Sequence, residues 1–546
     1  AGLGGSPIPF QMGIDKVRGS RSTRAMTNKP YRPWTPDQDF LLPPRPREWL
    51  PEGHLVYFVL DVVEQLDLGA ITAAIQNKDP RGVVPFDPRM MTALLLYGYS
   101  RGTYSSRRLA RATYDDVAVR FLAGGHHPHF TTIAGFRRDH LNALAGLFLQ
   151  VLQLCQAAGL AKLGHVSLDG TKIQANASKH SAMSYDRMKK EEARLSAEIA
   201  TLLARAHDQD AADDARLGEG QDEVDVPAEL ARREQRLARI QEARKALEQE
   251  AALARAAELR DLAAGNDERA SSPDVTDTQR KAAETRATNQ RKQAKELDRQ
   301  DDDDNPGSPS SGGSDTLPNH APAHKPEGTP DDTAPRNFTA PDSRIMAKGG
   351  DVLQGYNGQA AVDADSHVIV ACLLSNQPPD AEYLAPVLAE LEVNLGRQPT
   401  KVSADAGYWS EANAAWCEEH GVDAYIATQR RRHRTPPPAV GAILSDEAPP
   451  GEAAPPGEAS PERAESEEKP RQPTRQEAMR AKLATKEGHD VYRLRKCTPE
   501  PVFGNIKEAR GFRRFLLRGI EKVRREWAMV CTAHNLLKLF GAASAA

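Results

Sequence analysis

Residues 352–377, VLQGYNGQAAVDADSHVIVACLLSNQ, decide the fold class of this 546-residue chain. Apolar and polar residues alternate on both sides of the DADS turn, so the pattern predicts a β-hairpin. Working outward, three further strands are predicted by HVSLDG at 165–170, TKVSADAGY at 400–408 and VDAYIATQR at 422–430. The centre of the chain is therefore expected to form a β-sheet.

Helices are predicted between and after these strands. DAEYLAPVLAELEVNLG at 380–396 and SEANAAWCEEHG at 410–421 are amphipathic, and the segment from 476 onward is also helical. The order becomes strand, hairpin, helix, strand, helix, strand and helix. This order predicts an α/β fold with a mixed sheet of parallel and antiparallel pairs, and it matches the ribonuclease-H-like core.

An all-helical N-terminal unit is predicted at 51–160. Its helices carry a group of arginines that could contact DNA, including Arg107, Arg108 and Arg137. Two short helices around the turn at Gly124 loosely resemble a helix-turn-helix. The sequence leaves two alternatives open, a DNA-binding domain or a helical scaffold with solvated arginines.

Composition separates the remaining segments. Apolar residues recur every three, four or seven positions within 185–261, which predicts a coiled-coil-like helical hairpin. Two polar stretches rich in Pro, Gly and Ser are predicted to be disordered. The expected divisions are an extended basic and Pro-rich arm at 1–50, the helical domain at 51–160, the first part of the catalytic core at 161–184, the hairpin insertion at 185–261, a disordered linker at 262–336, more of the core at 337–433, a disordered insert at 434–475, and C-terminal catalytic and basic helices at 476–546.

Charge and cysteine content exclude several classes of protein. The formal net charge is −4, yet residues 486–538 hold 13 Lys and Arg against 6 Asp and Glu, which predicts a polyanionic partner there. The five cysteines form no CxxC pair, so neither a zinc knuckle nor a disulfide framework is expected. No apolar run of about 18 residues and no secretory signal are visible, so we expect a cytoplasmic protein.

Three carboxylates carry the chemical prediction. Asp169 and Asp405 each end a predicted strand, and Glu500 opens the basic helical stretch. Carboxylates at one edge of a sheet can hold two divalent metal ions, which clamp the attacking and leaving oxygens of an in-line phosphoryl displacement. With 76 Asp and Glu residues in the chain, three at element ends are also expected by chance, so spacing alone leaves ordinary capping roles open.

The sequence segments around these residues resemble those of a known protein family. The chain resembles the DDE transposases of bacterial insertion sequences, in the group with a Tyr-Arg-Glu-Lys signature. The matching segments are HLVYFVLDVVEQLDL, SLDGTKIQANASKH, NFTAPDSRIM, QGYNGQAAVD, ADAGYWS, EPVFGNIK and RGFRRFLLRGIEKVRREWAMVCTAHNLLKL. The resemblance implies that Asp169, Asp405 and Glu500 are the catalytic and metal-binding triad, within a ribonuclease-H-like core that follows a helical domain of transposase type.

The signature itself departs from the family pattern. That pattern is Tyr, two residues, Arg, three residues, Glu, six residues, Lys. Glu500 and Lys507 have the expected spacing, and so do Tyr492 and Arg495, but four residues separate Arg495 from the Glu. Either Arg495 or Lys496 could therefore fill the basic position. We expect Tyr492, Lys507 and these two basic residues to contact DNA.

The resemblance implies a function. The protein would bind the terminal inverted repeats of its element and use Mg²⁺, with Mn²⁺ as a substitute, for phosphodiester hydrolysis and strand transfer. Its partners would be double-stranded DNA, at element ends and target, and a second copy of the chain in the synaptic complex. It would be associated with the bacterial nucleoid. The alternatives are a non-catalytic DNA-binding regulator or decayed copy, and a nuclease of the same fold without strand transfer.

Some polar and aromatic residues are weaker candidates, for which structural roles are expected. They are the loop histidines His126, His127 and His129, Trp409 beside the second Asp, and His534 and Asn535 in the last helix.

Overall fold

The computed structural model describes residues 46–77, 84–217, 228–272, 275–302, 322–348, 351–429 and 473–545. The chain divides into two units, 1–49 and 50–546. In the first unit, the described residues form only the 3-10 helix η1, Pro46–Trp49. Most of the predicted arm at 1–50 and of the predicted insert at 434–475 lies outside the described residues.

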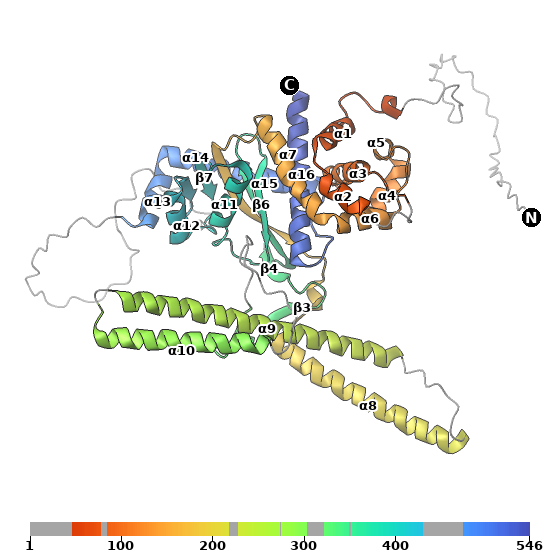
Figure 1. Cartoon of the computed structure of the whole chain (residues 1–546), viewed down its shortest axis with the longest axis vertical. Helices are drawn as coiled ribbons and strands as arrows, with labels where there is room; N and C mark the ends of the chain where they lie inside the picture. The colour runs from red at the N-terminus through yellow and green to blue at the C-terminus, as the bar shows by residue number, and fades with distance from the viewer. Residues whose placement is uncertain are drawn as a thin grey trace, which may run out of the picture. The chain divides into compact units, whose positions relative to one another are not determined.

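A mixed sheet forms the centre of the second unit (Figure 1). Its strands are β1 His165–Gln174, β4 Arg344–Lys348, β5 Asp351–Asp363, β6 Ile369–Ser375, β7 Lys401–Ala404 and β8 Asp423–Ile426. The order is β4-β5-β1-β7-β8, and β6 also pairs with β5. β5 is antiparallel to β1, β4 and β6, while β1, β7 and β8 are parallel. The prediction of an α/β fold with a mixed sheet is confirmed.

Helices on and beside the sheet begin and end with recognisable capping residues. They are α11 Leu384–Leu395, α12 Glu411–Glu419, α13 Arg475–Ala484, α14 Lys486–Cys497, α15 Pro499–Gly504, the π-helical segment η4 Asn505–Ala509, and α16 Ile520–Ala545. α11 ends at Gly396, whose φ of 72° is a left-handed conformation that glycine adopts without strain. α13 begins with a capping box formed by Thr474 and Glu477.

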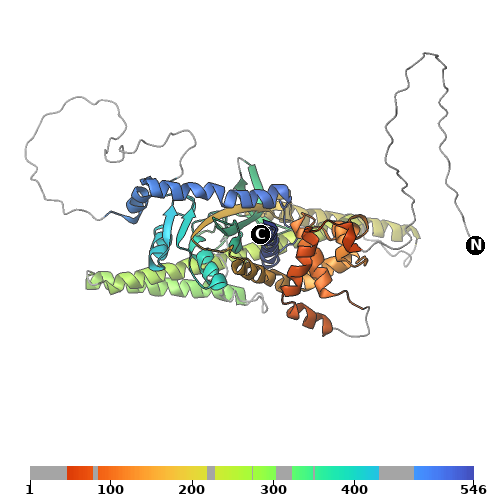
Figure 2. The ribbon, with the colours of Figure 1, turned by 90° about the horizontal axis from the view of Figure 1, so that it is seen from above.

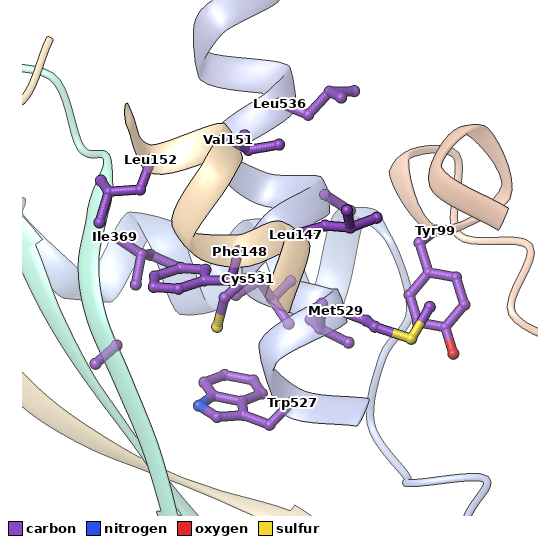
Figure 3. Close-up of a cluster of buried hydrophobic side chains, with 14 of the residues drawn as sticks. Tyr99, Leu147, Phe148, Val151, Leu152, Ile369, Trp527, Met529, Cys531 and Leu536 are labelled. Atoms are coloured by element: carbon purple, nitrogen blue, oxygen red, sulfur yellow. The ribbon is translucent and has the colours of Figure 1, made fainter. Parts of the chain in front are cut away.

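Seven helices form the N-terminal part of this unit. They are α1 Leu55–Gln65, α2 Gly69–Gln76, α3 Pro88–Ser100, α4 Ser106–Asp115, α5 Val117–Leu122, α6 Phe130–Asp139 and α7 Leu141–Ala157. α16 packs against α3, α7 and β6, so the helices and the sheet share one hydrophobic core. Figure 3 shows side chains from all four elements in that core, with Cys531 on α16 near Phe148 on α7 and Met529 on α16 near Tyr99 on α3.

An insertion of three long helices follows the first strand. It consists of α8 Tyr185–Leu217, α9 Ala228–Ser271 and α10 Asp277–Asp302, and α9 lies alongside α10 (Figures 1 and 2). A small sheet of β2 Ala182–Ser184 and β3 Pro335–Asn337, with the short helix η2 Lys179–Ser181, lies close to it in sequence.

Part of the predicted organisation of this insertion is wrong. Helices were expected at 185–261, and Met188, Leu195, Ile240 and Leu247 pack together as one apolar cluster. The expected disorder at 262–336 is contradicted by the end of α9, by α10 and by β3. These helices pack mostly through buried alanines, with Leu259 as a larger buried residue among them. The alanines are Ala256, Ala263 and Ala270 on α9 and Ala287 and Ala294 on α10. Their seven-residue spacing is that of a coiled coil, but their low hydrophobicity obscures the pattern.

Among the described residues, every helix is too short or too polar to span a lipid bilayer.

Candidate active site

Asp169 lies on β1, and Asp405 directly follows the neighbouring parallel strand β7. Ser167 of β1 pairs with Ser403 of β7, two positions before each aspartate, and the negative charge of Asp405 acts on Asp169. Asp405 directly follows β7, as predicted. The prediction that Asp169 ends its strand is wrong, because β1 continues to Gln174 and pairs with β5 up to that residue.

The environment of Asp169 disfavours its charged form. Burial raises the pKa of this carboxyl to about 7, and the negative charge of Asp405 adds to the effect, while the positive charge of Arg495 opposes it. The backbone N–H of Gly170 donates to Asp169 Oδ1 at 2.9 Å, and the N–H of Gly407 donates to Asp405 Oδ1 at 2.8 Å. Burial therefore outweighs the positive charge of Arg495, and two acidic groups lie near each other in the site.

Arg495, not Lys496, acts electrostatically on this pair. Arg495 is partly buried, its guanidinium lies 5.8 Å from the ring centroid of Tyr492, and its buried Nε has no hydrogen-bond partner among the described residues. Lys496 is exposed. The geometry favours Arg495 as the basic residue of the signature, with the extra residue before Glu500 absorbed where α14 ends and α15 begins.

Glu500 lies in the first turn of α15, which packs against β1 and β5. Its side chain is exposed. No three carboxylate, histidine or cysteine side chains in the described part of the chain come close enough to hold a metal ion. The structure thus brings the two aspartates together and leaves Glu500 on a neighbouring helix, outside any such cluster.

Lys507 contacts the strand that carries Asp169. Its Nζ donates to the backbone oxygen of Lys172 at 3.1 Å, from the π-helical segment η4. A π-helical turn changes the direction of side chains along a helix and is frequent at functional sites.

Sequence reasoning missed Asp380. Its Oδ1 accepts hydrogen bonds from Asn357 Nδ2 and Gln359 Nε2, both at 2.7 Å. Burial raises the pKa of this carboxyl, the two amide bonds oppose that effect, and the charge of Asp405 raises the pKa further. The signal that could have found it is the pair of polar residues at alternate positions, 357 and 359, within a buried strand.

The three arginines predicted to contact DNA have different environments. Arg108 is exposed, and Arg107 is exposed with its guanidinium 4.6 Å from the ring centroid of Phe130. Arg137 is buried and donates to Tyr99 Oη at 3.3 Å and to the backbone oxygen of Tyr104 at 3.0 Å. The prediction that Arg137 contacts DNA is therefore wrong, because its buried guanidinium donates its hydrogen bonds inside the core.

The weaker candidates have structural contacts. Asn535 bonds both the N–H and the C=O of Ile369 at 2.8 Å, and His534 Nε2 lies 2.9 Å from the backbone oxygen of His367. Trp409 packs against the core. His127 stacks on Tyr114, and His129 caps α6.

Comparison with known families adds a separate line of support. A model of the transposase DDE domain matches residues 322–536, which include Asp405, Glu500 and Lys507. A model of a second transposase domain, DUF772, matches residues 44–139, while Asp169 lies outside both matches. A comparison with curated proteins gives no match, and neither does one with solved structures. The chain therefore contains two transposase domains, in the order that the sequence resemblance predicts, and these matches support an insertion-sequence DDE transposase.

Proposed function

We propose that this transposase binds the terminal inverted repeats of its own insertion sequence and catalyses phosphodiester hydrolysis followed by strand transfer. The observation that carries the proposal is the pair Asp169, on β1, and Asp405, directly after the adjacent parallel strand β7, with the carboxyl of Asp169 buried and Arg495 near it. The strand order, with β5 antiparallel to the strands on both of its sides, supports a ribonuclease-H-like core.

The donor set fits a divalent cation such as Mg²⁺, with Mn²⁺ as a substitute. Mg²⁺ prefers oxygen ligands and usually takes one or two carboxylates, completing its shell with water and substrate phosphate oxygens. Asp169 and Asp405 supply two such carboxylates, and a bound cation would offset the burial and the smaller Asp405 repulsion that raise the pKa of Asp169. Glu500 would join them when α15 moves closer to β1.

Bound cations would supply charge stabilisation for an in-line displacement at phosphorus. The chain's own residues have separate roles. Asp169 and Asp405 would hold the cations at the sheet, and Arg495 would neutralise charge on the scissile phosphate. Lys507 fixes the end of the site by its bond to β1. The same site would serve both hydrolysis and the attack of the freed 3′-OH on target DNA.

DNA would approach over the basic residues of the C-terminal helices. Residues 486–538 have a local charge of +7, from 13 basic and 6 acidic residues, and phosphate contacts by Lys and Arg make binding dependent on salt. Arg107 and Arg108 would add contacts from α4. A homodimer in the synaptic complex belongs to the same proposal. The helical insertion α8–α10 would contact DNA ends or the second copy of the chain. The equal alternative is an insertion that contacts neither.

The test uses DNA that flanks the coding region and contains its inverted repeats. Wild-type protein should nick this DNA at the element end in Mg²⁺, and D405N should bind it equally well without nicking. The matched control is D365N, which changes an exposed Asp in the β5–β6 turn and should nick normally. Cleavage by D405N at the wild-type rate would reject the assignment of Asp405. Nicking without joining would identify a nuclease, and binding without nicking by the wild type would identify a regulator or decayed copy.

A further inference from the structure

Asp380 begins a chain of hydrogen bonds that ends at the turn after β7. Its Oδ1 accepts from the amides of Asn357 and Gln359, which are both buried on β5. Gln359 Oε1 in turn accepts a hydrogen bond from the hydroxyl of Tyr408, a fully buried side chain. Tyr408 lies three residues after Asp405, so these bonds connect Asp380 to the turn that carries Asp405.

The two glycines of the site lie directly against this network. A Cβ at Gly170 would lie 2.7 Å from Asp380 Oδ1 and 2.6 Å from Gln359 Nε2. A Cβ at Gly407 would lie 2.9 Å from Asp405 Oδ1 and 3.5 Å from Asp380 Oδ2. The carboxylate of Asp380 therefore lies between the backbone next to Asp169 and the turn next to Asp405, in space that only glycine at position 170 leaves free.

We propose that Asp380 is a positioning residue for Asp405. By holding Gln359, and through it Tyr408, it fixes the turn 405–408 against β5 and keeps Asp405 near Asp169 before any cation or DNA binds. Hydrogen bonds to an ionised acceptor are roughly twice as strong as neutral ones, which suits a carboxylate for holding two amides. Both bonds of Asp380 Oδ1 go to amides of β5, so the proposed action of Asp380 on the turn runs through that strand.

This inference rests on the proposed function only for the use that is made of Asp405. The ordering of the turn is a property of the free protein and can be measured without DNA or metal. Two backbone amides report it: Gly407 N–H donates to Asp405 Oδ1, and Tyr408 N–H donates to the Asp405 backbone oxygen at 3.1 Å.

Hydrogen–deuterium exchange of the full chain tests the proposal. In D380A, the peptide containing Gly407 and Tyr408 should exchange at least about tenfold faster than in wild type, because local opening is easier once the network is broken. Peptides from α7 should be unchanged. D380N should stay within about twofold of wild type, since the Asn Oδ1 can still accept both amide bonds. D365A, at an exposed turn, serves as the matched control.

Two results would overturn the proposal. Wild-type exchange in D380A would show that the turn does not depend on Asp380. Equal acceleration in D380A and D380N would assign the effect to charge and not to hydrogen bonding.

G170A provides an independent second variant. Its added Cβ should displace the Asp380 carboxylate and accelerate exchange of the same peptide, and unchanged exchange there would contradict the close approach. Mn²⁺ affinity, measured by calorimetry, should fall by about 10- to 100-fold in D380A but not in D380N, as for other residues that orient metal ligands. If the wild type proves unable to cleave DNA, the exchange result still stands, so failure of the proposed function and failure of this inference are distinguishable.

Discussion

Replacing Asp169 by Asn should stabilise the metal-free protein at alkaline pH. In the folded chain the carboxyl has a pKa of about 7, raised chiefly by burial, against an ordinary value of 3.8. At about 1.4 kcal/mol per pKa unit, holding Asp169 charged costs the fold at most about 4 kcal/mol.

The sign of the pH dependence follows from the raised pKa. The folded protein binds the Asp169 proton more tightly than the unfolded chain does, so this group contributes favourably below about pH 4. That contribution is lost as the pH rises through 7. The neutral Asn variant does not lose it, so the gain in stability from D169N should be small near pH 4 and largest at pH 8.

Thermal unfolding at several pH values measures this gain. At pH 8, D169N should unfold a few degrees above wild type, and the difference should shrink as the pH falls. Mn²⁺ should raise the midpoint of wild type at pH 8 and have little effect on D169N. The control D365N changes an exposed Asp and should show no such pattern. A D169N variant that is less stable than wild type at pH 8, or a gain independent of pH, would refute the electrostatic account of the site.

Three further predictions concern residues away from the aspartates. N535A should destabilise the protein by about 2–4 kcal/mol in urea unfolding, because both backbone groups of buried Ile369 lose their partner; a change below about 0.5 kcal/mol would be inconsistent with this role. R137A should destabilise by about 3 kcal/mol, whereas R108A should leave stability unchanged and weaken DNA binding in a filter assay; the reverse pattern would restore Arg137 as a DNA contact. R495M should lower the rate of DNA cleavage roughly 100-fold, and K496M should lower it much less. Equal losses would contradict a specific role for the positive charge of Arg495, which lowers the pKa of Asp169.

Alternating apolar residues made the sheet predictable from the sequence. The hairpin at 352–377 and the strands at 165, 400 and 422 all appear where the pattern indicates. The length of β1 was not predictable in the same way. Its second half contains Lys172 and Gln174, which resemble a loop, and they become part of a strand only because β5 supplies the backbone partners.

The helical insertion α8–α10 shows a different limit of prediction from the sequence. Alanines at seven-residue spacing bury little apolar surface each, so a window that is mostly polar and charged predicts disorder. Two long helices side by side nevertheless bury Ala256, Ala263 and Ala294 almost completely, and close approach of small side chains stabilises the pair.

Within the candidate site, the sequence predicted the proximity of the two aspartates better than the details around them. Asp405 follows its strand as expected, and β7 is the parallel neighbour of the strand that carries Asp169. Spacing could not decide between Arg495 and Lys496, since the answer depends on where α14 ends and α15 begins. The residues next to Asp380 do not distinguish it, because an Asp before a helix is an ordinary capping residue; the only signal lies on β5, in the polar residues at 357 and 359.

Strand transfer tests the central claim most directly. A pre-cleaved element end with a free 3′-OH is mixed with supercoiled target DNA, Mg²⁺ and the protein, and joined products are counted by sequencing. The wild type should insert the 3′ end into the target, while D169N, D405N and E500Q should each bind the end and produce no joined DNA. Joining by any of these three variants at the wild-type level, or its absence with wild-type protein that still nicks DNA, would contradict the account.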